Sequence, residues 1–90
     1  MVEIPVTKEF KKQYRKLPFS IKLKAEKRIA LFKKDIFCSS LRTEKLNPKD
    51  RQVWSFRIDQ QYRIIFRFTE TNKALFLMVG HHNWIYRYKF

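Results

Sequence analysis

Three kinds of hydrophobic spacing follow one another along the chain: strict alternation, then a helical period, then alternation again. Val2, Ile4 and Val6 alternate with other residues, which predicts a short strand at the start of the chain. Pro5 lies inside this stretch and lacks a backbone N–H, so we expect the strand at a sheet edge or at a bulge.

The next apolar positions predict a first helix. Phe10, Tyr14 and Leu17 follow one another at spacings of four and three, which places them on one stripe of a helix. Thr7 is a suitable N-cap residue. Pro18 should end the helix, because the residue before a proline avoids the helical region of backbone conformation.

A second helix follows with the clearest helical period in the chain. Its apolar positions step at four, four, three and four: Ile21, Ala25, Ile29, Phe32 and Ile36. Ser20 is a candidate N-cap. Basic residues occupy much of the other side: Lys22, Lys24, Lys27, Arg28, Lys33 and Lys34. The two helices joined at Pro18 therefore predict a hairpin whose apolar stripes face a sheet.

The second half of the chain predicts three strands after a polar loop. Residues 37–52 are polar and carry turn residues, and Leu41 and Leu46 are expected to fix this loop to the core. Strands are predicted at 52–58, 61–69 and 74–80, and the short links between them favour antiparallel neighbours. The apolar tail, residues 83–90, should pack down as a final strand or turn. The predicted fold is α+β, with the order β-α-α-β-β-β and a helical hairpin on one face of an antiparallel sheet.

Alternation within these strands separates two faces of the sheet. One face is strongly apolar and can receive the helices: Trp54, Phe56, Ile58, Tyr62, Ile64, Phe66 and Phe68. The other, here called the arginine face, carries Val53, Ser55, Arg57, Arg63, Ile65 and Arg67. An arginine inside a strand is costly unless it meets water, a carboxylate or a phosphate. We expect this face to be open to solvent, with His81 or His82 at its rim.

Size and charge narrow the class of protein. Ninety residues predict one domain, residues 1–90, and the formal net charge of +13 favours polyanionic partners such as nucleic acid. Cys38 is the only cysteine and no secretory segment is seen, which favours a reducing cytoplasm. No apolar run approaches the roughly 20 residues of a membrane helix. One cysteine and two adjacent histidines give no spaced zinc ligands, so no metal or other cofactor is predicted.

The ordered set of these features resembles the RelE/ParE toxin superfamily of bacterial and archaeal toxin–antitoxin systems. The segments that carry the resemblance are the Lys16-Leu17-Pro18 link, residues 54–58, residues 62–66 and residues 79–86, and together with the layout they cover nearly the whole chain. The resemblance is nearest to the YoeB-, RelE- and HigB-like mRNA interferases. It implies an endoribonuclease that cuts messenger RNA, usually at the ribosome. ParE-like members of the superfamily instead poison DNA gyrase.

The YoeB-type pattern assigns candidate residues by resemblance. Two arginines six residues apart follow a Trp-Ser pair in that pattern, as Arg57 and Arg63 do here, and a glutamate lies ten residues before the tryptophan, as Glu44 does. YoeB-type enzymes finish with a His-Tyr pair. This chain instead has His81-His82, then Tyr86 and a longer tail.

Metal-free RNA cleavage by attack of a 2′-hydroxyl needs a base, a group that neutralises the phosphorane and an acid. Arg63 is predicted to hold the scissile phosphate, with Arg57 supporting it. Glu44 is the candidate base or orients one. His81 or His82 is the other acid–base candidate, since neighbouring residues in a strand point to opposite faces. Tyr86 is a candidate donor to a phosphate oxygen or a base-stacking residue.

Other interpretations remain open for the same residues. Arg57 and Arg63 can simply pair with Asp59 and Glu70, and Glu44 can be an ordinary loop carboxylate. A ParE-like gyrase inhibitor needs the fold but no acid–base set, and a nucleic-acid-binding module needs no catalysis.

The partners that the resemblance implies are an acidic antitoxin, messenger RNA and the ribosome. Operator DNA would be reached only through the antitoxin.

Overall fold

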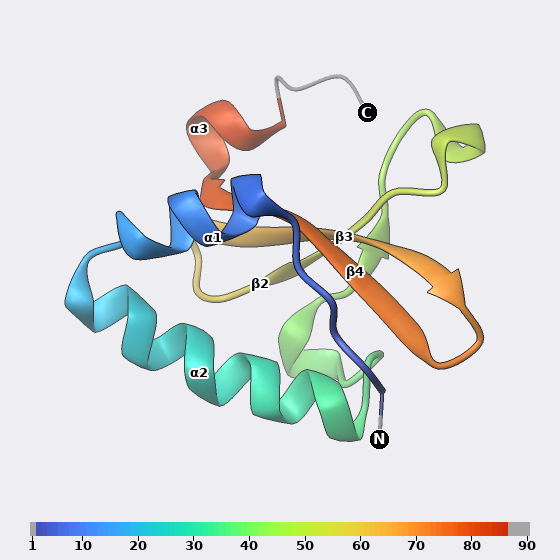
Figure 1. Ribbon diagram of the computed structural model, residues 1–90, viewed down its shortest axis with the longest axis horizontal. Coiled ribbons are helices and arrows are strands. Elements are labelled where there is room, and N and C mark those ends of the chain that lie inside the picture. The colour runs from blue at the N-terminus through green and yellow to red at the C-terminus, as the bar shows by residue number, and fades with distance from the viewer. Residues whose placement is uncertain (1, 87–90) are drawn as a thin grey trace.

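The computed structural model describes residues 2–86 and places three helices around one sheet (Figure 1). Helices α1 (Lys8–Arg15) and α2 (Phe19–Lys34) come first, and the short helix α3 (His82–Ile85) comes last. Between them lie strands β1 (Glu44–Lys45), β2 (Trp54–Arg57), β3 (Tyr62–Glu70) and β4 (Lys73–His81). Two 3-10 turns, Ser39–Leu41 and Lys49–Arg51, flank β1. The α+β prediction with a helical hairpin on an antiparallel sheet is confirmed.

The helical hairpin forms as its sequence predicts, apart from one cap and the end of the second helix, which stops at Lys34 before the predicted Ile36. The Thr7 hydroxyl accepts a hydrogen bond from the Phe10 N–H at 3.0 Å and donates to the Leu77 carbonyl at 2.8 Å. It therefore caps α1 and fastens it to β4. The prediction of Ser20 as the cap of α2 is wrong, because the helix already begins at Phe19 and Pro18 is the N-cap. Proline suits this position since it has no N–H to leave unpaired.

The four strands form one sheet in the order β1-β2-β3-β4, with every neighbouring pair antiparallel. Strands β2, β3 and β4 agree with the three predicted strands to within a few residues. Strand β1 was not predicted, because it consists of two residues inside the polar loop at 37–52. That loop is fixed as expected: Leu41 is buried in the main core and Leu46 packs on the other side of the sheet.

The predicted strand at residues 2–6 exists only as an extended segment beside β4. Two isolated parallel bridges join Glu3 to Lys73 and Val6 to Phe76. Glu3 and Thr7 each donate a backbone hydrogen bond to this edge of the sheet, at 2.8 and 3.1 Å. Pro5, which lies between them, has no N–H to donate. The segment lies at the edge of the sheet, as Pro5 predicts, but it forms isolated bridges rather than the continuous ladder of a strand.

The main core lies between the helical hairpin and the apolar face of the sheet. The Phe32 ring of α2 is fully buried and lies 4.6 Å from the ring of Phe56, 5.0 Å from that of Phe66 and 5.4 Å from that of Phe76. Ile21 and Ala25 are buried on the same side of α2. Large aromatic side chains spaced at the helical and strand periods thus bring the hairpin onto this face.

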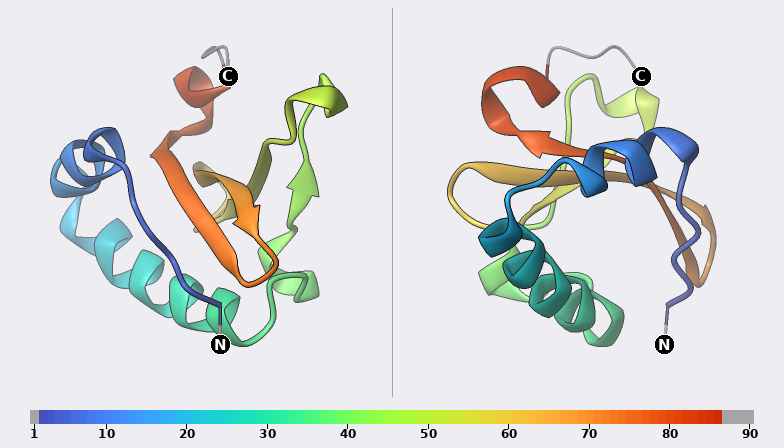
Figure 2. Two further views of the ribbon diagram at one scale, coloured as in Figure 1. Left: turned by 45° about the vertical axis from the view of Figure 1, so that its right-hand side comes forward. Right: turned by 60° about the vertical axis from the view of Figure 1, so that its left-hand side comes forward.

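The opposite face is not open, contrary to the sequence-based expectation. Val53, Ile65, Met78 and Ile85 form a second, smaller apolar cluster there, with Leu46, Leu77 and Trp84 packed around it. Ile85 comes from α3, which lies across the sheet from the α1–α2 hairpin (Figure 2). The tail was expected to form a strand or a turn. It instead forms a helix over residues 82–85, and residues 87–90 lie outside the described range.

Candidate functional site

Strand register gathers four of the polar side chains on one face. Arg57 pairs with Arg63, and Arg63 pairs with Gly80. In the next row Glu44 pairs with Ser55, and Ser55 lies two residues before Arg57. Cross-strand partners project to the same face of a sheet, and so do residues two apart in one strand. Glu44, Ser55, Arg57 and Arg63 therefore share the arginine face.

The two arginines differ in their surroundings. Arg57 is half-buried, whereas the Arg63 residue is only 8% exposed. Nη1 of Arg63 donates to the carbonyl of Asp59 at 2.7 Å and to that of Tyr62 at 3.2 Å. Arg63 thus secures the turn between β2 and β3. Both arginines lie on the predicted face, but the expectation that both project into solvent is wrong for Arg63.

The carboxylates proposed as simple partners for these arginines are engaged elsewhere. The Asp59 carboxylate accepts from the N–H groups of Gln61 and Tyr62, both at 2.8 Å, and lies 3.6 Å from the Lys24 ammonium. Burial alone raises the pKa of Asp59, but the backbone N–H groups of Tyr62 and Gln61, together with Lys24, hold that pKa below its ordinary value.

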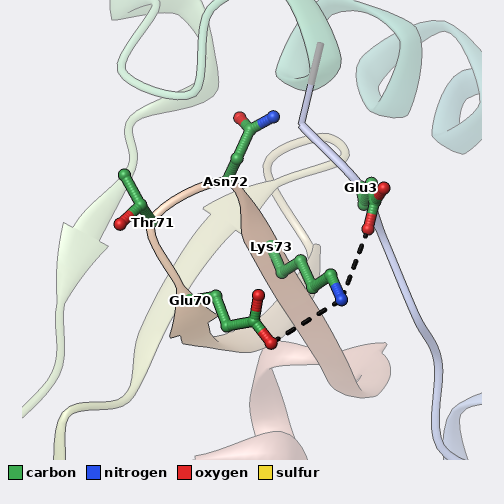
Figure 3. Close-up of a pocket in the computed structure, with 5 residues that line it drawn as sticks. All are labelled: Glu3, Glu70, Thr71, Asn72 and Lys73. Carbon is green, nitrogen blue, oxygen red and sulfur yellow. Dashed lines mark ion pairs between the residues drawn. The ribbon is translucent and has the colours of Figure 1, made fainter.

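A hollow of about 330 Å³ lies at the other end of β3 and β4, at the turn between them. Lys73 spans it, with its ammonium 3.6 Å from the carboxylates of both Glu3 and Glu70 (Figure 3). Glu70 lies at the opposite end of β3 from Arg63, and the Lys73–Glu3 ion pair links the N-terminal segment to the sheet.

Arg67 lies on the same face, four residues along β3. Its Nη2 donates to the carbonyl of Arg51 at 3.2 Å, and its buried Nε has no hydrogen-bond partner. Arg67 therefore holds the loop before β2. It lies two rows of side chains away from the Arg57–Arg63 pair on the same face.

Tyr86 reaches the arginine face from the end of α3. Its hydroxyl lies 3.5 Å from that of Ser55, and Ser55 is the strand partner of Glu44. Tyr86 is 42% exposed and Glu44 is exposed, so both are accessible from solvent. The predicted carboxylate and phenol are thus both neighbours of one buried serine, Glu44 as its strand partner and Tyr86 through its hydroxyl.

The histidines are not placed with these groups. His81 is the strand partner of Tyr62, and their ring centroids are 5.3 Å apart. Its side chain belongs to the other face of the sheet, and its Nδ1 caps α3 by accepting from the Asn83 N–H at 3.0 Å. His82 is exposed and stacks on His81 at 4.7 Å. Strand alternation would place His82 with the arginines, but α3 begins there and ends the alternation.

Sequence reasoning missed the contact that positions α3. A Cβ atom added to Gly80 would lie 1.9 Å from Cζ2 of Trp84, so the indole ring occupies the space that a side chain would fill. Gly80 is the chain's only glycine and lies inside a strand. An isolated glycine in a strand indicates close approach by another group, and that signal was available in the sequence.

The described residues contain no group of three or more His, Cys, Asp or Glu side chains arranged to hold a metal ion. Within residues 2–86, no helix combines the length and apolar character needed to cross a membrane. The polar groups that strand register and the Tyr86 contact bring to the arginine face are a carboxylate, guanidinium groups and hydroxyls.

Comparison with protein families decides the relationship that these features suggest. Residues 8–82 match the family described as the RelE-like toxin of type II toxin–antitoxin system HigB. The chain belongs to this HigB-like toxin family. The match confirms the resemblance to the RelE/ParE superfamily, and it includes both helices of the hairpin, all four strands, Glu44 and both arginines.

Solved structures share the fold of this HigB-like toxin. RelE in the RelB–RelE complex of Methanococcus jannaschii has a TM-score of 0.74 at 20% identity, over 93% of this chain and 96% of that one. The YoeB/ParE toxin of Agrobacterium tumefaciens has a TM-score of 0.72 at 18% identity, over 89% of this chain and 98% of that one. YafQ of Escherichia coli has a TM-score of 0.73 at 13% identity, over 92% of this chain and 96% of that one. A comparison with curated protein sequences finds no significant match.

Proposed function

We propose that this HigB-like toxin is an endoribonuclease that cleaves messenger RNA at the arginine face without a metal ion. The observation that carries the proposal is the row of Glu44 and Ser55 beside Arg57 and Arg63, with the Tyr86 hydroxyl 3.5 Å from that of Ser55. A carboxylate, a guanidinium and a phenol near one another supply a proton acceptor, a phosphate ligand and a proton donor.

The proposed reaction uses each group once. The Glu44 carboxylate accepts the proton of the 2′-hydroxyl as the 2′-oxygen attacks the adjacent phosphorus. Arg57 donates to the equatorial oxygens of the phosphorane, where charge develops. The Tyr86 hydroxyl donates its proton to the 5′-oxygen as the P–O5′ bond breaks. The products are a 2′,3′-cyclic phosphate and a 5′-hydroxyl, and exchange with water restores Glu44 and Tyr86.

Arg63 has a different part in this proposal from the one predicted for it. Because it is buried and bound to the turn carbonyls, it adds positive charge behind Arg57 and positions the turn rather than gripping the phosphate directly. His81 and His82 have no assigned proton transfer, since His81 caps α3 on the other face.

The partners follow from charge and from the relatives. A formal net charge of +13 supports docking on ribosomal RNA through phosphate contacts, with messenger RNA presented at the ribosome. Several similar solved structures are toxin–antitoxin complexes, including the RelB–RelE complexes of Methanococcus jannaschii and Escherichia coli. We include a cognate acidic antitoxin among the partners of this chain.

The test is to incubate purified protein with ribosomes translating a defined message and to map new 5′ ends. Wild type should produce new ends. Glu44→Gln and Tyr86→Phe should each slow their appearance by about 100-fold, the range that general acid–base groups contribute. An intact message in the presence of active ribosomes would overturn the nuclease proposal and favour a binding module or a gyrase inhibitor.

His82→Asn is the matched control for this experiment. It removes an exposed imidazole that is not among the polar residues Glu44, Ser55 and Arg57 of the arginine face. Cleavage should therefore stay within about twofold of wild type. If His82→Asn abolishes cleavage while Glu44→Gln retains it, the assignment of the acid and base is wrong although the protein is still a nuclease.

A further inference from the structure

Helix α2 exposes apolar side chains as well as basic ones. It buries Ile21, Ala25 and Phe32 against the sheet. On its outer side Phe19 is 75% exposed and Leu23 is 46% exposed. The basic residues predicted for the outer side of α2 therefore share it with exposed apolar side chains. Phe19, Leu23 and Lys27 follow at spacings of four, so they are neighbours along the helix surface.

A groove runs beside this exposed stripe, between α2 and the β2–β3 turn. It has a volume of about 420 Å³ and is lined by Lys24, Lys27, Arg28, Leu31, Ile58 and Asp59. Its accessible apolar part is Leu31 of the helix, since Ile58 is only 1% exposed and belongs to the main core. Its only acidic group, Asp59, already lies 3.6 Å from the Lys24 ammonium and accepts two backbone N–H groups.

The groove thus offers an excess of positive charge beside apolar surface. The groups left for a partner are the ammonium of Lys27 and the guanidinium of Arg28, and Nη1 of Arg28 also donates to the Ser40 carbonyl at a long 3.4 Å. A phosphate backbone matches the cations but gains nothing from Leu23, Leu31 or Phe19. A helix with one acidic and one apolar stripe matches both parts of the surface, in the helix-in-groove mode of recognition.

We propose that the α2 groove and the adjoining Phe19–Leu23 stripe bind an acidic amphipathic helix of a protein partner. The inference rests on the proposed function in so far as that partner is the antitoxin. The groove lies between α2 and the start of the β2–β3 turn, at Ile58 and Asp59. Glu44, Ser55 and Arg57 instead lie on the arginine face. The structure thus assigns partner binding and RNA chemistry to separate surfaces of the toxin.

The probe for this proposal is a synthetic peptide of about 16 residues, some four helical turns, with leucines on one face and glutamates on the other. A scrambled peptide of the same composition is its control. Titration calorimetry should show the patterned peptide binding at least about tenfold more tightly than the scrambled one. Amide resonances of residues 19–31 and 58–59 should shift in NMR spectra of the full chain.

Substitutions make the test specific to the groove. The double variant L23S/K27E removes an apolar contact and reverses a charge, and the two changes together should weaken binding of the patterned peptide by at least about tenfold. Lys33→Glu makes the same charge change on an exposed part of α2 outside the groove, and binding should stay within about threefold. Circular dichroism should show that both variants are folded.

Several results would overturn the proposal. These are equal affinity for the two peptides, equal losses in L23S/K27E and Lys33→Glu, resonance shifts confined to the arginine face, or no binding at about millimolar peptide. Preferential shifts of groove resonances by a single-stranded RNA oligonucleotide would assign the groove to RNA instead. Message cleavage by L23S/K27E should match wild type. A wild-type protein that binds the patterned peptide but leaves message intact would refute the nuclease proposal alone.

Discussion

The two faces of the sheet are built from the same strands but differ in how they are covered. The α1–α2 hairpin covers one face with 24 helical residues and a stack of buried phenylalanines. The four-residue helix α3 covers part of the other, through Ile85 and Trp84. Side chains on the first face are buried and only pack against one another. The second combines a small apolar cluster with a row of polar side chains that solvent still reaches.

This difference separates the residues that hold the fold from those available for chemistry. Arg57 and Tyr86 remain accessible because α3 is too short to cover the whole arginine face, whereas Phe32 has no access to solvent. Arg63 belongs to both groups, since it lies in the polar row and also secures the β2–β3 turn. Substitutions on the helix-covered face should therefore lower stability, and substitutions on the arginine face should lower activity. Arg63 is the exception, because its substitution should lower both.

The largest effect is expected on the helix-covered face. Phe32→Ala should lower the free energy of unfolding by about 3–5 kcal/mol, because it leaves a cavity among three buried rings. Urea denaturation followed by circular dichroism measures it. Phe37→Ala is the control: Phe37 is 58% exposed, and its loss should cost less than about 1 kcal/mol. Equal costs would mean that the Phe32 cluster does not carry the stability.

The next effect compares the two arginines. Arg57→Ala should slow message cleavage by about 100-fold, roughly 3 kcal/mol of transition-state stabilisation, while the free energy of unfolding changes by less than about 0.5 kcal/mol. Arg63→Ala should slow cleavage and also cost about 1–3 kcal/mol of stability, because the Asp59 carbonyl loses its 2.7 Å guanidinium donor and the Tyr62 carbonyl keeps only backbone donors. Parallel cleavage and denaturation assays check both. Equal destabilisation by the two variants would contradict the distinction between them.

A smaller effect is expected where α3 meets the sheet. Gly80→Ala places a methyl group inside the Trp84 ring position, so α3 must shift, at a cost of about 1–3 kcal/mol. Cleavage should fall as well, since Tyr86 follows α3 directly. The double variant G80A/W84A tests the cause: with the ring removed, Gly80→Ala should cost much less. If its cost is unchanged by Trp84→Ala, the strain lies in the strand instead.

The smallest effect concerns pH and the β2–β3 turn that supports Arg63. The pKa of Asp59 is lowered in the folded state, so its stabilisation is present above the unfolded pKa of about 3.9 and is lost as pH falls through the lower folded pKa. Asp59→Asn should cost about 1 kcal/mol at pH 7, and the difference from wild type should shrink below about pH 4. Urea denaturation across this range measures it, with the exposed Asp50→Asn as control. A difference that grows on acidification would reverse the sign of the argument.

The sequence was sufficient for the elements with long, regular patterns. The stripe from Ile21 to Phe32, the proline at position 18 and alternation through β2 and β3 each follow from local geometry, and each agrees with the structure. Strand β1 and helix α3 did not follow, because two and four residues are too short to show a period. Both form through contacts with distant residues, such as Ile85 with the cluster around Ile65.

The candidate site could be predicted where strand register decides it. Alternation alone placed Arg57 and Arg63 on one face, and Glu44 came from the resemblance to YoeB-type toxins. The position of Tyr86 beside Ser55 depends on the turn of the chain into α3. The same turn of the chain into α3 moves His81 and His82 away from the predicted rim, so the position predicted for the histidines was wrong.

The contact between Trp84 and Gly80 has a practical consequence, because the chain has two tryptophans and the sheet separates them. Trp54 packs against the main core, beside Phe37 and Phe68, and Trp84 lies on the arginine face. Replacing either with phenylalanine leaves a single intrinsic fluorophore that reports on one side of the protein. Emission from Trp84 alone would register events at the arginine face, and emission from Trp54 alone would register loosening of the hairpin.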